Sequence, residues 1–125
     1  MNTKALLIVT ALIEVGAGSV LLVVPSLAVE FLLGNGLSSP QAIVVARIAG
    51  SALISVGFAC WLGRNGEHRA QAVLVAGMVI YNIAVPVVLI HGWIALSLEG
   101  LGLWPACILH TVLAVWCIVC LWRIR

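Results

Sequence analysis

The chain has 125 residues, of which 64% are hydrophobic and only 8% are charged. Soluble domains average about 25% charged residues, so this composition excludes a soluble fold and indicates a single membrane domain. The formal net charge of +2 comes from a few scattered basic residues, which excludes a nucleic-acid-binding surface.

Four apolar segments are long enough to cross a bilayer as helices. At 1.5 Å per residue, about 20 helical residues cross the roughly 30 Å hydrocarbon core. The predicted spans cover residues 4–24, 40–62, 71–91 and 104–122. Ser39 as N-cap and Pro40 as the first helical residue start the second span. We therefore predict an all-α membrane protein, an antiparallel bundle of four transmembrane helices that forms one domain over residues 1–125.

The acidic residue Glu14 lies near the middle of the first span. Residues that share its helix face at spacings of three and four are Thr10, Ala11, Ala17 and Gly18. Their small side chains let another helix come close. A charge at this depth costs at least about 2.5 kcal/mol on insertion scales, so we expect Glu14 to be paired with a residue of another span.

Residues 26–33 predict a short amphipathic helix between the first two spans. Pro25 ends the first span because proline restricts the residue before it and cannot continue the helix. Gly34 stops the short helix. We expect this helix to lie along the outer surface of the membrane with Glu30 toward water. The residues expected to face the membrane are Leu27, Phe31 and Leu33.

The other three spans carry isolated polar residues. The second span contains Arg47, the third contains Tyr81 and Asn82, and the fourth contains His110. Pro86 leaves the carbonyl of Asn82 without its helical partner, so we expect a kink there. Every span therefore contributes a polar side chain to the bundle.

Helical rise places polar residues from all four spans in one layer in the outer half of the membrane, about 9 to 15 Å deep. These residues are Glu14, Arg47, Asn82 and His110. The offset in depth between Glu14 and Arg47 is about 5 Å, which an arginine side chain can reach. We therefore predict an ion pair between the first and second spans.

We favour a non-enzymatic binding or accessory protein in which the polar layer forms a pocket open to the outer face. The expected ligand is a small amphipathic molecule such as a quinone or a lipid headgroup, and no cofactor other than such a quinone is expected. The candidate ligand-binding residues are Glu14, Arg47, Tyr81, Asn82 and His110. In a structural alternative there is no ligand, and the ion pair and interhelical hydrogen bonds, worth about 0.6 to 2 kcal/mol each, only fix the helix packing.

The four cysteines all lie within predicted spans, so they do not form a secreted-type disulfide framework and are expected to pack as small apolar residues. Cys107 and Cys117 share a helix face with His110 but are about 15 Å apart, too far for one metal, and no metal site is expected. Cys117 and Cys120 form a C-x-x-C pair. The second cysteine pair, which quinone-linked thiol oxidoreductases carry in a loop, is missing here.

Three motifs stand in the first half of the chain. They are E-V-G-A-G-x-x-L-L-x-x-P at Glu14–Pro25, L-L-G at Leu32–Gly34 and A-R-I-A-G-x-A-L-I-x-x-G-x-x-x-W at Ala46–Trp61. This half resembles the DoxX-like group of small bacterial four-span proteins. The resemblance implies a four-helix bundle in the bacterial inner membrane and, as in some relatives, an accessory role in a quinone-linked or redox assembly.

The first span carries a second, shorter likeness. Ala11–Val15, A-L-I-E-V, with Gly16 and Gly18 is similar to the first helix of small multidrug resistance transporters. In that family a membrane glutamate exchanges protons for cationic drugs, so the likeness implies a proton-coupled transporter that uses Glu14. The tyrosine and tryptophan positions and the glycine-rich dimerisation helix of the family do not appear, and Arg47 beside the acid would repel a cationic substrate.

Basic residues are confined to the termini and the second connection, apart from the arginine within the second span. They are Lys4, Arg64, Arg69, Arg123 and Arg125, whereas the first and third connections carry Glu30 and Glu99 and no Lys or Arg. By the positive-inside rule both termini are cytoplasmic. We expect a multi-pass protein of the bacterial inner membrane. Its expected partners are the lipid bilayer and the amphipathic ligand, with a homo-oligomer or a larger membrane complex left open.

Overall fold

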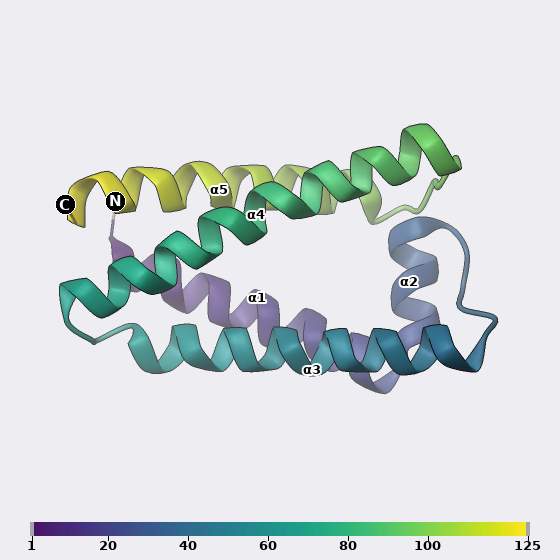
Figure 1. Ribbon diagram of the computed structural model, residues 1–125, viewed down its shortest axis with the longest axis horizontal. Coiled ribbons are helices and arrows are strands. Elements are labelled where there is room, and N and C mark those ends of the chain that lie inside the picture. The colour runs from purple at the N-terminus through teal and green to yellow at the C-terminus, as the bar shows by residue number, and fades with distance from the viewer. Residues whose placement is uncertain (1, 125) are drawn as a thin grey trace.

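The computed structural model describes residues 2–124, and this part of the chain forms five α-helices and no strand. They are α1 (Thr3–Val23), α2 (Pro25–Leu33), α3 (Pro40–Gly63), α4 (His68–Leu96) and α5 (Leu103–Ile124). All except α2 are long and apolar enough to cross a membrane. The prediction of an all-α, four-span membrane protein is therefore confirmed, and Figure 1 shows the four long helices running alternately in opposite directions.

The helix starts follow from local capping. The Asn2 side chain accepts a hydrogen bond from the Lys4 backbone N–H at 2.9 Å, and Ser39 accepts one from the Ala42 N–H at 3.1 Å. Each satisfies a donor that the first turn of a helix leaves free. Pro40 follows Ser39 as the first residue of α3, as predicted.

The helix α4 is longer than the predicted span over residues 71–91. It runs through Pro86 without a break in helical structure and ends only where Ser97 adopts a left-handed conformation, with φ of 52°. The N–H of Leu98 then closes the helix end on the carbonyl of Gly92 at 3.3 Å. The length of an apolar segment predicts which residues lie in the membrane, but it does not predict the end of this helix. That end is set by a backbone turn, which a hydropathy pattern does not reveal.

The long helices form two tight pairs, α1 with α3 and α4 with α5. In Figure 1 the first pair lies below the second, and the two pairs diverge toward the end where α2 lies. Glycine makes the first pair close. A Cβ on Gly18 would lie 2.6 Å from the carbonyl oxygen of Gly50, and one on Gly57 would lie 3.0 Å from that of Ala11. The predicted close contact of α1 is therefore confirmed at Ala11 and Gly18, whereas Ala17 is exposed.

The short helix α2 crosses from one pair to the other at the end opposite the termini (Figure 1). Leu27, Phe31 and Glu30 are exposed, as predicted for an amphipathic surface helix. The prediction that Leu33 faces the membrane is wrong, because Leu33 is partly buried against the cluster that contains Leu89. The last turn of α2 points inward because it docks on the α4–α5 connection.

That docking is a backbone contact. The Gly102 N–H donates a hydrogen bond to the Phe31 carbonyl at 2.8 Å. Gly34 ends α2 with a φ of 87°, and a Cβ there would lie 2.8 Å from the Glu99 carbonyl oxygen. The connection after α4 therefore packs directly on the end of α2, and the two helix pairs are joined at this end.

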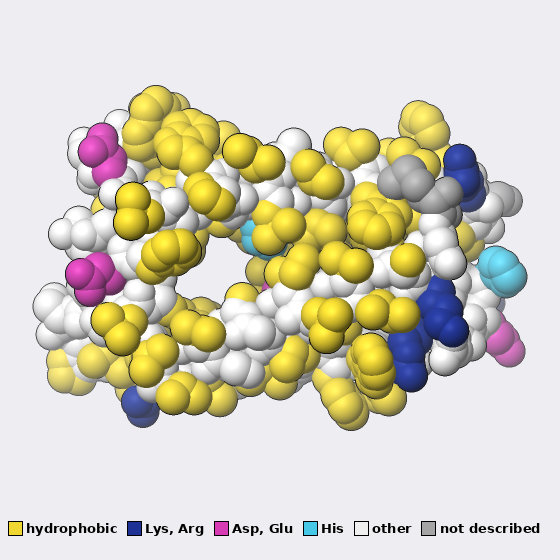
Figure 2. Space-filling view, turned by 180° about the vertical axis from the view of Figure 1, so that it is seen from behind, with side chains coloured by type: hydrophobic (Ala, Val, Ile, Leu, Met, Phe, Trp, Pro, Cys, Tyr) yellow, Lys and Arg dark blue, Asp and Glu magenta, His cyan; other side chains and the backbone are white. Residues whose placement is uncertain are grey.

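Charge is divided between the two ends of the bundle. Figure 2 shows most basic side chains gathered at the end where the chain starts and finishes, together with an acidic one, and acidic side chains at the opposite end, together with a basic one. We call the first the basic end, defined by Lys4, Arg64, Arg69 and Arg123. The predicted basic residue Arg125 lies outside the described residues.

Candidate functional site

Glu14 lies in the interior at the middle of α1, with 1% of its surface exposed. Its Oε2 accepts a hydrogen bond from the Tyr81 hydroxyl of α4 at 3.3 Å, while Oε1 has no hydrogen-bond partner. One turn earlier, the fully buried hydroxyl of Thr10 also has no partner. Buried polar atoms are nearly always hydrogen-bonded, so two free oxygens on one face of α1 mark a place where a ligand or water can bind.

Asn82 and His110 form a second buried polar contact between α4 and α5. The Asn82 side-chain amide donates to the Met78 carbonyl at 2.8 Å, which leaves its Oδ1 as an acceptor 2.8 Å from His110 Nδ1. His110 Nδ1 must therefore carry the proton and donate it, and in the neutral ring Nε2 is the free acceptor. This bond fixes the orientation of the His110 ring.

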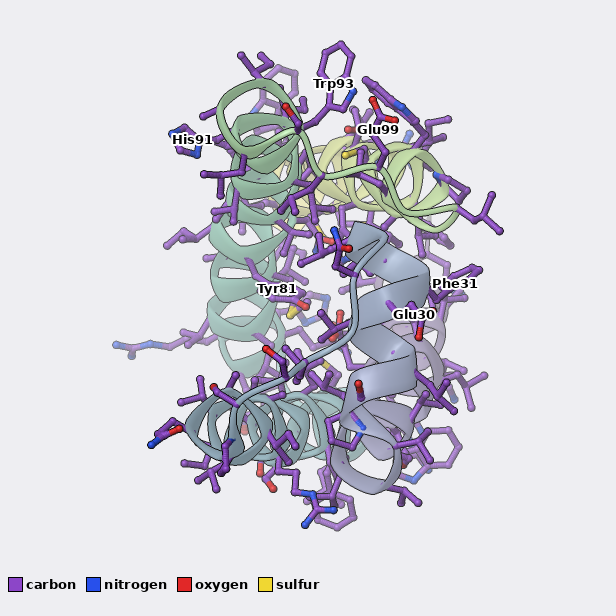
Figure 3. All side chains as sticks on the ribbon, turned by 90° about the vertical axis from the view of Figure 1, so that its right-hand side faces the viewer. Glu30, Phe31, Tyr81, His91, Trp93 and Glu99 are labelled. Atoms are coloured by element: carbon purple, nitrogen blue, oxygen red, sulfur yellow. The ribbon has the colours of Figure 1, made fainter. Side chains whose placement is uncertain are left out.

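Tyr81 connects the two polar contacts. Its ring meets the His110 ring edge to face, with centroids 5.4 Å apart and an interplanar angle of 84°. Figure 3, seen from the α2 end, shows Tyr81 pointing from α4 into the space between the helices, whereas His91 points outward. Sequence reasoning named four residues that lie together here, Glu14, Tyr81, Asn82 and His110. We refer to them as the polar cluster.

Arg47 is not part of the polar cluster, and the predicted ion pair with Glu14 is wrong. Arg47 is exposed on α3, and the hydrogen-bond partner of Glu14 is Tyr81. The reason is the register of the first helix pair. Gly57 packs between Ala11 and Val15, level with Glu14, whereas Arg47 stands about 15 Å from Gly57 along the helix.

The estimate of membrane depth from helical rise was wrong for Arg47 because it placed the outer ends of the first two spans in one plane. In the structure, Gly50 already packs against Leu21 and Leu22, close to the end of α1 at Val23. The first ten or so residues of α3 therefore extend beyond α1, at the level where α2 crosses, and Arg47 is among them.

An apolar cavity of about 280 Å³ lies between α3 and α4. Its lining residues are Val56, Ala59 and Cys60 of α3 and Val73, Leu74, Gly77, Met78 and Tyr81 of α4. These two helices belong to different pairs and pack loosely on one another, which leaves the cavity open at the side. It extends along α4 from Val73 on the basic-end side to Tyr81, the residue whose hydroxyl donates to Glu14.

A hole runs through the bundle between the two helix pairs, and a histidine side chain lies at its edge (Figure 2).

Three cysteines pack in one buried core, as expected for small apolar residues. Cys60, Cys117 and Cys120 are free thiols buried with Leu6 and Leu7, and Cys107 is buried in the second core cluster near α2. No group of three or more histidine, cysteine or acidic residues among residues 2–124 is arranged to hold a metal ion.

Two features of the site were not recognised in the sequence. Thr10 was noted only as a neighbour of Glu14, although its buried hydroxyl, like Glu14 Oε1, has no hydrogen-bond partner. Cys60 and Met78 line the apolar cavity, and their apolar spans give no signal that distinguishes a cavity from a filled interface. The i, i+4 spacing of Thr10 and Glu14 was the one available indication.

Comparisons with protein-family models, with curated proteins and with solved structures give no match for this chain. The class of protein is therefore defined by the fold itself. Four apolar helices of spanning length and a buried polar cluster define a small multi-pass membrane protein.

Proposed function

We propose that this chain is a membrane-embedded binding protein for a small amphipathic molecule of the quinone or quinol class. The observation that carries the proposal is the open apolar cavity between α3 and α4 that ends at Tyr81, whose hydroxyl holds a buried glutamate with one free oxygen. A ligand would leave the lipid through the open side of the cavity. Its apolar part would lie along α4, and its polar head would reach Glu14.

The free polar atoms suit a head group with hydroxyl or carbonyl oxygens. Glu14 Oε1 would accept a hydrogen bond from a quinol hydroxyl, and the Thr10 hydroxyl would donate to a quinone carbonyl or accept from a quinol. Neither residue is among those that line the cavity, so the head group would reach them past Tyr81. The cavity volume of about 280 Å³ is just below the range of about 300–1,000 Å³ for ligand pockets. It therefore accommodates one ring and the start of a tail, and the remaining tail would stay in the lipid.

The resemblance to DoxX-like proteins supports the same proposal, since some of those relatives are accessory subunits of quinone-linked or redox assemblies. The chain would then bind the quinone, and a partner subunit would carry out the redox chemistry. The buried, free Cys117 and Cys120 belong to the packed core and do not line the cavity.

Replacing Tyr81 by phenylalanine should weaken binding of a benzoquinol with a decyl tail about fivefold to tenfold, because a hydroxyl that shapes the polar limit of the cavity is lost. Thr10→Val should have an effect of similar size. Isothermal titration calorimetry in detergent measures both affinities.

Arg47→Gln is the matched control for these variants, since Arg47 is a polar residue of a span that lies outside the polar cluster. It should leave the affinity unchanged. Absence of saturable binding to the unmodified protein, or equal affinities for Tyr81→Phe and Arg47→Gln, would refute the proposal. Mass spectrometry of small molecules that copurify from native membranes then separates a quinone from a lipid headgroup.

A proton-coupled transporter is the second candidate, and the position of Arg47 favours it. The sequence argument against a cationic substrate was a basic residue beside Glu14, and Arg47 does not lie there. Glu14 is the only acidic residue within the four long helices, and no cation is paired with it. A cationic amine that displaced a proton from Glu14 would gain the partner that the carboxylate lacks.

Transport predicts proton movement in proteoliposomes when a gradient of a cationic amine is imposed, and its complete loss in Glu14→Gln. The change of internal pH, followed with an entrapped dye, is the measurement. Liposomes with Thr111→Val protein provide a control, because the Thr111 hydroxyl bonds only to the Cys107 carbonyl of its own helix. No proton movement with any of a panel of amines would exclude this function.

We also propose that both termini face the cytoplasm of a bacterial cell and that the protein lies in the inner membrane. The position of the basic end supports this orientation, since cytoplasmic segments are enriched in Lys and Arg. A fluorescent protein fused after Arg125 should fold and fluoresce, whereas alkaline phosphatase fused there should be inactive. The opposite pair of results would invert the topology.

A further inference from the structure

A second cavity, separate from the Tyr81 site, lies at the basic end of the bundle. It has a volume of about 460 Å³ and is formed where the start of α1, the α3–α4 connection and the end of α5 meet. Its charged lining residues come from these three segments and are Lys4, Arg64 and Arg123, and His68 at the start of α4 also lines it. No acidic residue among residues 2–124 lines it, and Glu67, the acid of the α3–α4 connection, is exposed outside it. Among the described residues the cavity therefore gathers positive charge without an acidic side chain in its lining.

Arg64 is held in place within this cavity. Its guanidinium group stacks over the Trp61 ring, 3.9 Å from the ring centroid, and donates to the Trp61 carbonyl. The Gln71 side-chain amide donates to the Arg64 carbonyl at 3.0 Å, which fixes the connection around it. A guanidinium group fixed in this way needs to lose little freedom when it binds an anion, and its planar set of donors suits phosphate oxygens.

The cavity is also at the level where lipid headgroups would lie. It stands at the ends of three spanning helices, and Trp61 and Trp122 are exposed beside its residues Arg64 and Arg123. Tryptophan is enriched at the headgroup level of membranes, and basic pockets between spanning helices bind anionic headgroups. Neighbouring apolar side chains such as Leu62, which is 62% exposed, offer acyl chains a surface.

We propose that this cavity binds the phosphate group of an anionic phospholipid of the leaflet at the basic end. Lys4, Arg64 and Arg123 would surround the phosphate, and its charge would offset the repulsion among the three cations. Because Lys4 and Arg64 belong to the α1–α3 pair and Arg123 to the α4–α5 pair, the bound lipid would join the two pairs at the basic end, as α2 joins them at the other end.

The test is retention of lipid by the full chain in native mass spectrometry after delipidation and addition of phosphatidylglycerol or phosphatidylcholine. The protein should retain phosphatidylglycerol at least about tenfold more than phosphatidylcholine. Lys4→Gln and Arg123→Gln should each lower retention about fivefold, the change expected for loss of one basic residue near a membrane surface. Both side chains are exposed, so these variants should fold.

Arg69→Gln is the matched control, because Arg69 is exposed at the same end but does not line the cavity. Its retention of phosphatidylglycerol should equal that of the unmodified chain. Equal retention of the two lipids, or equal losses in Arg69→Gln and Arg123→Gln, would overturn the proposal. Glycerol 3-phosphate that binds as tightly as phosphatidylglycerol would overturn the assignment to a lipid, since the acyl chains would then contribute nothing.

Discussion

The Gly18→Ala variant is expected to lose about 1 to 3 kcal/mol of stability, the usual cost of forcing extra volume into a packed interface. The added Cβ would lie 2.6 Å from the Gly50 carbonyl oxygen and 2.9 Å from the Ile54 backbone nitrogen. Backbone cannot rotate away as a side chain can, so α1 and α3 must separate. Titration of the folded protein with a denaturing detergent, followed by far-ultraviolet circular dichroism, measures the loss.

Gly16→Ala is the matched control for this experiment. Gly16 lies two residues from Gly18 on the same helix, and a Cβ there would meet nothing within 4 Å. Alanine is a better helix former than glycine by up to about 1 kcal/mol, so Gly16→Ala should be neutral or slightly stabilising. Equal stabilities of the two variants would show that α1 and α3 are not in close backbone contact.

The Asn82→Leu variant should also lose about 1 to 3 kcal/mol of stability. It leaves the buried His110 Nδ1–H without its acceptor and also removes the bond from Asn82 to the Met78 carbonyl. His110→Leu should cost a similar amount. The double variant should cost less than the sum of the two, because neither substitution then leaves the other side chain's polar group without its partner.

The comparison variant is Thr111→Val. The Thr111 hydroxyl that it removes donates to the Cys107 carbonyl of the same helix, so this bond does not join two helices. Combined with Asn82→Leu, it should give additive losses of stability in thermal melts in detergent. Additive losses for Asn82→Leu with His110→Leu would instead mean that the α4–α5 hydrogen bond contributes nothing.

The spanning helices were predictable because they depend on properties of single segments. Length, apolar composition and the caps at Ser39 and Pro40 are local, and they identified the four long helices and the start of α3. The end of α4 was not predictable in this way, because the turn at Ser97 interrupts a segment that remains largely apolar.

The candidate site was predictable only as far as depth along each helix determines position. Glu14, Asn82 and His110 come close together because their spans do overlap at that depth. Arg47 does not, because the register of α1 against α3 is set by which glycines meet, and the sequence shows small residues without showing their pairing. The search for a charged partner also favoured Arg47 over Tyr81, whose neutral hydroxyl satisfies one oxygen of the acid.

Each tight helix pair consists of spans that are consecutive in the chain, α1 with α3 and α4 with α5, since α2 does not cross the bundle. Such a hairpin completes its main contact as soon as its second span has been synthesised and has entered the bilayer, before the other hairpin exists. Assembly of the protein during translation therefore reduces to docking two finished hairpins. The loose α3–α4 contact, where the apolar cavity lies, belongs to the interface that such docking would form.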